Sequence, residues 1–230
     1  MSTEEHKALI ESLRGRLIVS CQAYPGEPMR IPETMAQVAL AAEAGGAAAI
    51  RCQGLADISA IRGRVSVPVI GLWKDGNSGT VITPSLKHAL SCHWAGADVV
   101  AIDATGRPRR DGRTLAQTIT ALDEEDVLVM ADCGSLTDAE RAVEAGAGLL
   151  STTLAGYTGE RDKTEGPDLE VLAQIVAAFP GIPVVAEGRV SSPDDAQAAV
   201  ETGAWAVVVG TAITHPTSIT ERFSRAVSRS

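Results

Sequence analysis

Short apolar runs recur along the whole chain, and nearly every run is followed by a polar or charged residue. The length of each run suits a buried strand, whereas the longer segments between the runs carry apolar residues at the spacing of a helix face. The chain therefore predicts strands and helices in strict alternation. The predicted strands are 17–21, 47–50, 67–73, 99–102, 127–131, 149–150, 183–186 and 206–210, and the predicted helices are 33–45, 54–63, 84–95, 112–122, 137–145, 168–179, 193–202 and 218–228.

Local signals at the helix ends support this alternation. Thr83-Pro84, Thr137-Asp138 and Ser192-Pro193 place capping residues, a proline or an early acid where helices begin. Glycine followed by a small residue recurs where helices end, which lets the backbone take a left-handed turn into the next strand. These exits are 43–47, 94–97, 144–147 and 201–204, and they mark a repeated strand–helix unit.

Alternating strands and helices form a parallel sheet, which is either an open doubly wound sheet or a closed barrel. An open nucleotide-binding sheet usually shows GxGxxG after its first strand, but here that strand runs into Cys21-Gln22-Ala23. We therefore expect an α/β fold, a single TIM (β/α)8 barrel domain over residues 1–230. Residues 4–13 are expected to form a short extra helix that caps the barrel bottom.

The composition and net charge limit the classes of molecule that this chain is expected to bind. The 230 residues are 45% hydrophobic and 3% aromatic, which suits strands buried on both faces. A net charge of −9 disfavours nucleic acid and anionic lipid, since polyanions need a basic surface. The four cysteines lack CxxC spacing, and the charged N-terminal segment lacks the apolar centre of a signal peptide. We expect a soluble cytoplasmic protein with reduced thiols and no membrane span.

Closure of a barrel would bring the residues at the C-terminal ends of its strands to one mouth. Lys74 follows a buried strand and Trp73, so desolvation would lower its pKa and let the neutral amine act as a base or a Schiff-base nucleophile. The alternative is a lysine that extends from a loop into solvent. Other strand ends supply Gln22, Arg51, Asp132 and Thr153.

Glu187 places a carboxylate at the same mouth, where it is expected to act on substrate or, alternatively, to form a structural ion pair with Arg189 or Arg51. Asp103 and Asp132 occupy equivalent strand ends. One of these two aspartates is expected only to hold Lys74 or an arginine in place.

The loops after the seventh and eighth strands are where such barrels commonly bind phosphate. Gly188 and Arg189 follow one strand, and Gly210 and Thr211 follow the other, so backbone N–H groups could approach an anion closely. The glycines could equally serve tight turns. The basic stretch 107–110 either draws in an anionic substrate or forms a solvated loop.

The histidines do not have the spacing of a metal site. Only His215 follows a strand closely enough to reach the mouth, and zinc needs three or four convergent ligands. We therefore predict no catalytic metal.

Six motifs in order resemble the bacterial N-acylglucosamine-6-phosphate 2-epimerases, also called N-acetylmannosamine-6-phosphate 2-epimerases. They are Leu17–Ala23, Gly45–Arg51, Ala101–Thr105, Ser151–Thr158, Glu187–Arg189 and Gly210–Thr214, and together they span nearly the whole chain.

The resemblance implies a cofactor-independent TIM barrel that interconverts N-acetylmannosamine 6-phosphate and N-acetylglucosamine 6-phosphate in sialic acid catabolism. It implies that Lys74 and Glu187 are the catalytic pair. The remaining residues carried over by motif are Gln22, Arg51, Asp132, Thr153 and His215 for the sugar and Gly188, Arg189, Gly210 and Thr211 for the phosphate. A homodimer is also expected.

This sequence departs from the resemblance at three places. His215 stands where the family usually has arginine, and Trp73 and Cys133-Gly134 stand where small or aliphatic residues are typical. These departures bear on substrate contacts more than on reaction class.

The expected mechanism is proton transfer at C2 of the open-chain sugar, with Lys74 as base and Glu187 serving the opposing transfer or the ring oxygen. Asp132 would orient Lys74, and Arg51 would stabilise the enolate oxygen. Two other classes stay open from the residues alone: a Schiff-base lyase or synthase on a phosphorylated carbonyl compound, and a non-catalytic barrel that senses a phosphosugar or binds regulatory RNA.

Overall fold

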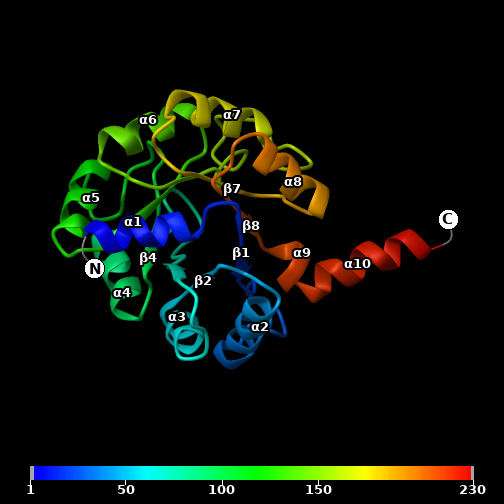
Figure 1. Cartoon of the computed structure of the whole chain (residues 1–230). Helices are drawn as coiled ribbons and strands as arrows, with labels where there is room; N and C mark the ends of the chain where they lie inside the picture. The colour runs from blue at the N-terminus through cyan, green and yellow to red at the C-terminus, as the bar shows by residue number, and fades with distance from the viewer. Residues whose placement is uncertain (1–2, 229–230) are drawn as a thin grey trace.

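The computed structural model describes residues 3–228, and its centre is a closed barrel of eight parallel strands (Figure 1). The strands pair in chain order, and the first closes on the last. This confirms the predicted fold class. The strands are β1 (Arg16–Cys21), β2 (Ala49–Gln53), β3 (Val69–Leu72), β4 (Val99–Asp103), β5 (Leu128–Asp132), β6 (Leu150–Ser151), β7 (Val184–Glu187) and β8 (Ala206–Val209).

Helices alternate with the strands and surround the barrel (Figure 1). They are α1 (Thr3–Ser12), α2 (Pro32–Ala44), α3 (Leu55–Arg62), α4 (Leu86–Trp94), α5 (Leu115–Asp123), α6 (Leu136–Glu144), α7 (Leu169–Ala178), α8 (Pro193–Glu201), α9 (Thr211–Thr214) and α10 (Pro216–Val227). The predicted helices lie close to these bounds. The sequence did not predict α9, a single turn directly after β8, and β2 continues past Ile50 so that Arg51 lies within the strand.

Each strand is buried on both faces because its side chains point alternately into the barrel and toward the helices. On β1, Ile18 belongs to the cluster that fills the barrel, and Val19 belongs to the larger cluster between strands and helices. On β3, Ile70 and Val69 divide in the same way. This double burial is why the sequence shows continuous apolar runs.

Helix ends follow the local chemistry of the sequence. Ser85, Ser135 and Ser192 each accept a backbone N–H in the first turn of the helix that follows, which satisfies a donor that the helix itself cannot pair. At the other end, the predicted exits contain a glycine with positive φ, as at Gly46 (99°) and Gly203 (106°). The chain therefore turns sharply from each of these helices into the next strand.

The N-terminal helix α1 lies across the end of the barrel where the strands begin (Figure 1). Leu9 and Ile10 pack against the interior cluster, and Leu13, just after the helix, is completely buried within it. The Trp205 indole N–H donates to the Ile10 carbonyl oxygen at 2.8 Å. The expected cap on the barrel bottom is confirmed.

The C-terminal helix α10 is arranged differently from the others. Neighbouring helices pack on one another from α2 round to α8, whereas α10 packs mainly on α9 and points away from the barrel (Figure 1). None of its described residues is buried. Phe223 and Val227 are 65% and 79% exposed, so α10 presents an uncovered apolar side.

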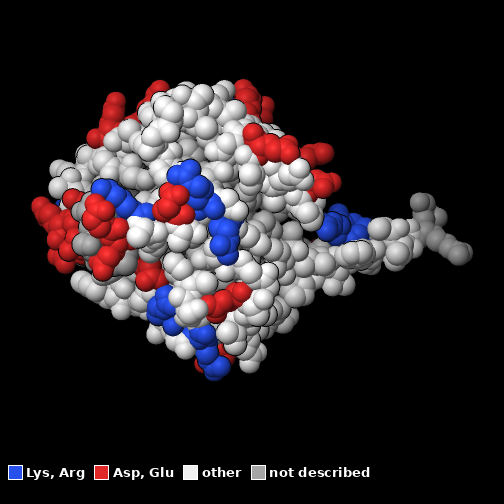
Figure 2. Space-filling model, viewed as in Figure 1, with Lys and Arg blue, Asp and Glu red and all other residues white. Residues whose placement is uncertain are grey.

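Surface charge fits the acidic composition. On the face drawn in Figure 2, acidic side chains stand at several places round the outline, with a large group at the left edge, and the basic side chains between them form no single large basic area. Within residues 3–228, none of the helices is both long and apolar enough to cross a bilayer.

The cap predicts a stability effect. Replacing Leu13 by Ala should lower the free energy of unfolding by about 2–5 kcal/mol, because it leaves a cavity in the barrel interior. Urea denaturation measures this change. Leu40→Ala, at a half-exposed position on α2, is the matched control and should cost about 1 kcal/mol or less. Equal effects of the two substitutions would show that burial of Leu13 under the barrel does not stabilise the fold.

Candidate active site

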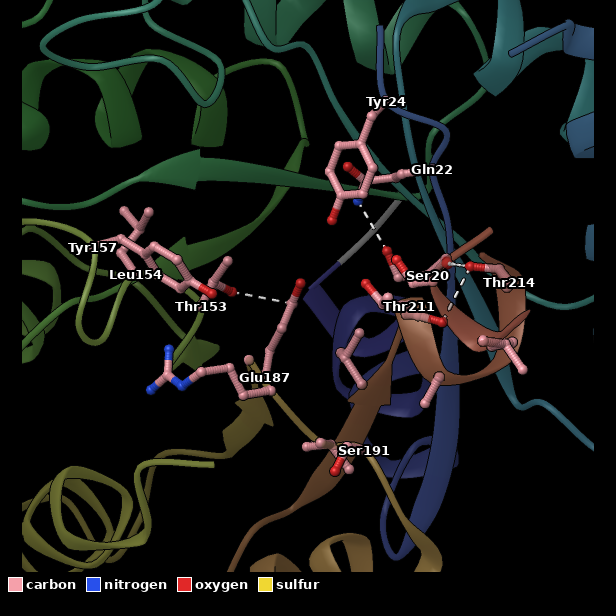
Figure 3. Close-up of a pocket in the computed structure, with 18 of the residues that line it drawn as sticks. Ser20, Gln22, Tyr24, Thr153, Leu154, Tyr157, Glu187, Ser191, Thr211 and Thr214 are labelled. Atoms are coloured by element: carbon pink, nitrogen blue, oxygen red, sulfur yellow. Dashed lines mark hydrogen bonds between the residues drawn. The ribbon is translucent and has the colours of Figure 1, made fainter. Parts of the chain in front are cut away.

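A cavity of about 620 Å³ opens at the C-terminal ends of the strands (Figure 3). Eight of the sequence-predicted site residues line it: Gln22, Lys74, Thr153, Glu187, Gly188, Arg189, Gly210 and Thr211. Arg51, Asp132 and His215 are not among its lining residues. Residues at the ends of β1, β3, β6, β7 and β8 thus meet at one mouth, whereas Arg51 and Asp132, which were also expected there, do not line it.

Beneath the cavity lies a buried ionic group that connects three strands. Arg51 donates to both carboxylate oxygens of Asp132, at 3.1 and 2.6 Å, and its Nη1 lies 3.2 Å from Glu187 Oε2. The Thr153 hydroxyl lies 2.9 Å from Asp132 Oδ1 and 3.0 Å from Glu187 Oε2 (Figure 3). Arg51 and Asp132 are 1% and 0% exposed, so these contacts are shielded from water.

Burial sets the charge state of this group. Burial raises the pKa of Glu187, the Arg51 guanidinium opposes that rise, and Asp132 adds to it. For Arg51, burial acts to lower the pKa, but the carboxylates of Asp132 and Glu187 outweigh it and the pKa is raised. Arg51 therefore stays charged, while Glu187 holds a proton to higher pH than an ordinary glutamate.

Lys74 approaches the cavity from the loop after β3. Its Nζ donates to Gln22 Oε1 at 2.8 Å, and Gln22 Nε2 donates to the Ser20 hydroxyl at 3.0 Å. Solvent reaches the amine from the cavity, but protein surrounds it elsewhere, and this desolvation together with the charge of Arg51 lowers its pKa. The carboxylates of Glu187 and Asp132 oppose this shift only in part.

The structure corrects the expected role of Asp132. Both of its oxygens are engaged by Arg51, and the hydrogen-bond partner of Lys74 is Gln22. Asp132 therefore holds an arginine, which was one of the roles expected for it, and influences Lys74 only through its charge. Its expected contact with the sugar stays a prediction.

The predicted phosphate corner is formed by the loops after β7 and β8. Gly188 and Arg189 have φ of 111° and 59°, so the backbone turns sharply beside the cavity. A Cβ at Gly210 would lie 3.3 Å from Ser20 Cβ, which leaves little room for a side chain where α9 begins. The backbone is thus the closest protein surface to this corner.

The side chain of Arg189 is committed to the protein itself. It donates to the carbonyls of Ala155 and Gly166 and to the Thr164 hydroxyl, and it lies 5.3 Å from the ring centre of Tyr157. Arg189 therefore fastens the long loop between β6 and α7.

His215 is buried behind the cavity wall. Its ring packs edge-on against Tyr24 at 5.1 Å, its Nδ1 pairs with the Ser218 hydroxyl at 2.7 Å, and its Nε2 lies 3.3 Å from Glu27. It accepts from the Ser218 N–H as the cap of α10. Tyr24 lines the cavity and His215 does not, so the geometry gives no support to the expected contact of His215 with substrate, which stays a prediction.

Strand-end reasoning missed several lining residues. Tyr24, Tyr157 and Ser191 lie on loops (Figure 3). Ile82 comes from a segment that returns to the mouth. Arg222 and Arg225 line one side from α10. The motif Ser151–Thr158 was the one signal that pointed toward Tyr157.

The basic stretch after β4 has internal partners. Arg107 pairs with Asp103 at 2.6 Å, Arg110 pairs with Asp75 at 2.6 Å, and Arg109 is buried. The stretch does not line the cavity, and although Pro108 and Arg110 are exposed, its three arginines are bound within the protein. Among residues 3–228, no group of three or more histidine, cysteine or acidic side chains is arranged to hold a metal ion.

Comparison with known proteins points to one family. A family model described as "Putative N-acetylmannosamine-6-phosphate epimerase" matches residues 35–229. A protein of Cutibacterium acnes named "Putative N-acetylmannosamine-6-phosphate 2-epimerase" is 62% identical over 221 residues, which cover 95% of this chain and 96% of that protein. A protein of the same name from Caldanaerobacter subterraneus is 46% identical over 219 residues, with coverage of 94% and 92%.

Solved structures agree. The N-acetylmannosamine-6-phosphate 2-epimerase from Clostridium perfringens superposes with a TM-score of 0.91 at 36% identity, covering 95% of this chain and 96% of that one. A thiamine phosphate pyrophosphorylase from Pyrococcus furiosus, at 17% identity and a TM-score of 0.59, shares the barrel fold alone.

The ionic group predicts a pH-dependent loss of stability. Arg51→Met should cost about 3–5 kcal/mol at pH 7, because it leaves Asp132 and Glu187 buried without a counter-charge. Arg51 opposes the raised pKa of Glu187, so in the variant this pKa should rise further in the folded state. Stability is then lost as pH rises from the unfolded-state pKa through the folded-state pKa, and the cost should shrink toward pH 4. Urea titrations across this pH range measure the effect.

Lys7→Met is the control for removing one positive charge. Lys7 and its partner Glu4 are exposed, at 67% and 82%, so the substitution should have little effect at either pH. A cost of Arg51→Met that does not change with pH would contradict the buried charge balance described above.

Proposed function

The chain belongs to the N-acetylmannosamine-6-phosphate epimerase family, and we propose that it interconverts N-acetylmannosamine 6-phosphate and N-acetylglucosamine 6-phosphate in the cavity at the barrel mouth. It is accordingly an isomerase that acts on a phosphorylated amino sugar. The observation that carries the site assignment is the placement of Lys74 and Glu187. Lys74 follows β3 and Glu187 ends β7, and these two strands are separated by three strands in either direction round the barrel. Both residues line one cavity.

Opposite placement suits inversion at one carbon. Epimerisation at C2 removes a proton and returns it on the other face, and the C2 hydrogen becomes acidic when the ring opens and C1 becomes an aldehyde. A neutral Lys74 amine takes the proton, and the low pKa of this lysine increases the fraction of the neutral form. Glu187, which holds its own proton to higher pH than usual, serves the opposing transfer or the ring oxygen.

Arg51 sets the electrostatic background for both groups. Its charge limits the rise in the Glu187 pKa, and it also disfavours a second positive charge on Lys74. The guanidinium is buried and bound by both carboxylates. We therefore assign Arg51 the role of holding and tuning Glu187 rather than of contacting the enolate oxygen directly.

Gln22 and Thr153 place polar groups where the sugar hydroxyls would lie, next to Lys74 and Glu187 respectively. The phosphate is assigned to the backbone at Gly188, Gly210 and Thr211, where glycine allows close approach. The reaction exchanges protons without net oxidation, so its chemistry requires no redox cofactor.

Two substitutions test the assignment. Lys74→Ala and Glu187→Gln should each lower kcat by roughly 10²–10⁴-fold, the usual contribution of a positioned acid or base. Proton NMR of N-acetylmannosamine 6-phosphate incubated with enzyme in D₂O measures both product formation and deuterium at C2. Lys87→Ala removes an exposed lysine on α4 and should leave both unchanged.

The same experiment separates the alternatives. If both variants retain most of the wild-type activity, the site assignment is wrong. A barrel that only senses a phosphosugar would give neither product nor C2 label. Trapping of a substrate adduct on Lys74 by borohydride would instead indicate Schiff-base chemistry.

We further propose that the protein is a homodimer in which α10 of each chain covers the other. Its apolar side carries Ile219, Phe223 and Val227 at i, i+4 and i+8. Ile219 is partly buried beside the cavity, whereas Phe223 and Val227 are 65% and 79% exposed. Each helix from α2 to α8 packs on the next one along the chain, but α8 and α2, at the two ends of this series, do not pack on one another in the same way. A second copy of the chain would cover the apolar side of α10, and its own α10 would present the same apolar side in return.

Phe223→Asp should therefore shift the protein from dimer to monomer, because it places a charge in the proposed contact. Light scattering after size exclusion measures the mass. Ser224→Asp adds the same charge about 100° further round the helix and should leave the dimer intact. A wild-type protein that is monomeric at micromolar concentration would contradict the proposal.

A further inference from the structure

The segment that follows Lys74 returns to the barrel and lies beside it. Lys74 and Ile82 form an antiparallel bridge, and the Asp75 N–H donates to the Val81 carbonyl at 3.1 Å. Thr83, at the end of this return, donates its N–H to the Trp73 carbonyl at 2.8 Å. Lys74 is therefore held in a small hairpin, residues 73–83, rather than in an open loop.

This hairpin is wedged between the ends of β3 and β4. Gly71 pairs with Val100, so the same register continued would place Trp73 opposite Ile102. In a parallel ladder the Trp73 N–H would then donate to the Ala101 carbonyl, and the Asp103 N–H to the Trp73 carbonyl.

Ile82 and Thr83 replace both of these ladder bonds. The Thr83 hydroxyl accepts the Trp73 N–H at 3.2 Å and donates to the Ala101 carbonyl at 2.7 Å. The Asp103 N–H donates to the Ile82 carbonyl at 3.1 Å instead. The hydroxyl thus stands between the two strands at the point where Lys74 leaves β3.

Thr83 makes these contacts in an unfavourable backbone conformation. Its φ is 47°, in the left-handed region that a β-branched residue rarely occupies, and its side chain is completely buried. Such strain, of order 1–3 kcal/mol, persists where surrounding contacts enforce it. Here the contacts are the two hydroxyl bonds and the two bonds of the Thr83 backbone.

The second backbone bond comes from the basic stretch after β4. Arg109 donates one guanidinium nitrogen to the Thr83 carbonyl at 2.6 Å and the other to the Asp103 carbonyl at 2.9 Å. Arg109 is 7% exposed and has no acidic partner in hydrogen-bond contact. The buried guanidinium thus bridges two backbone carbonyls and clamps the end of the hairpin to the end of β4.

We infer that Thr83, clamped by Arg109, is a positioning residue for Lys74: it fixes the backbone from which the lysine reaches the C2 proton. The inference rests on the proposed function of Lys74. Thr83 does not line the cavity, so it acts through the hairpin and does not touch substrate.

The amine that the hairpin carries faces charges from several elements. These are Arg51 on β2, Asp132 on β5, Glu187 on β7 and Arg30 on the loop between β1 and α2. Its position among them sets its proton affinity. If the hairpin relaxes and the amine moves outward into solvent, its pKa should rise toward the ordinary lysine value.

Three variants test the inference. Thr83→Val keeps the side-chain shape but removes the hydroxyl, and it should lower kcat about ten- to hundredfold, as expected for a displaced base, while KM changes less than about threefold. Its rising limb in the pH profile of kcat/KM should move to higher pH. Thr83→Ser retains the hydroxyl and should restore both. Thr118→Val removes another completely buried threonine hydroxyl, bonded to the Thr114 carbonyl in α5, and is the matched control.

A merely structural role would give a different result. It would lower the melting temperature of Thr83→Val as much as that of Thr118→Val but leave kcat and the pH profile at their wild-type values, which would overturn the inference. An effect of Thr83→Ser equal to that of Thr83→Val would also overturn it, because the hydroxyl would then be irrelevant.

A direct titration keeps the inference separate from the proposed reaction. The lysines of the chain are Lys7, Lys74, Lys87 and Lys163, so ¹³Cε-lysine labelling gives few signals, and Lys74→Arg assigns the one of interest. We expect the Lys74 signal to titrate at higher pH in Thr83→Val than in wild type. The same titration in both proteins would overturn the inference even if the enzyme is active.

Absence of epimerase activity in wild type would instead refute the proposed function and leave the titration to decide the role of Thr83. Should Thr83→Val fail to fold, Arg109→Lys provides the second test. It keeps the charge but cannot donate to both carbonyls in the same geometry. The Lys74 signal should then shift in the same direction, and an unshifted signal would overturn the inference.

Discussion

The buried guanidinium of Arg51 is the interaction on which the site depends. Removing a charge from water is expensive, and a buried cation is tolerated only where carboxylates lie close enough to repay that cost. Asp132 meets this requirement with two hydrogen bonds, and Glu187 adds a third contact at Nη1 of the same guanidinium. Because neither carboxylate can move away without stranding a charge, the positions of β2, β5 and β7 at the mouth are tied together.

This arrangement separates the two reactive groups electrically. Glu187 shares Arg51, so its carboxyl stays inside the ionic group, whereas the Lys74 amine hydrogen-bonds to the neutral amide of Gln22. An amine bound directly to a carboxylate would have its pKa raised and would stay protonated near neutral pH, so it could not accept a proton. With Gln22 as partner and Arg51 as a nearby like charge, desolvation lowers the pKa of Lys74 instead. The same cation therefore stabilises one charge and discourages another.

The sequence predicted the barrel because double burial leaves continuous apolar runs and because glycine exits repeat at each helix end. It also placed Lys74 and Glu187, since a polar residue directly after a buried strand faces the mouth. How deep each side chain lies below the mouth was harder to predict. Arg51 lies inside β2 and points below the cavity, and a pattern of strand ends does not distinguish that position from one that lines the surface. The depth of His215 was hidden for a related reason, because a one-turn helix, α9, follows β8 and the ring packs against Tyr24.

The two halves of the site are held by different means. Glu187 ends a strand whose ladder bonds and buried ionic contacts fix it from within the barrel. Lys74 lies just beyond its strand, where the ladder between β3 and β4 has been opened by Ile82 and Thr83. A side chain that must reach across the mouth benefits from starting outside the sheet, but a loop alone would leave it mobile. The strained threonine and its arginine clamp resolve this conflict, because they extend the order of the sheet to a residue that the sheet no longer contains.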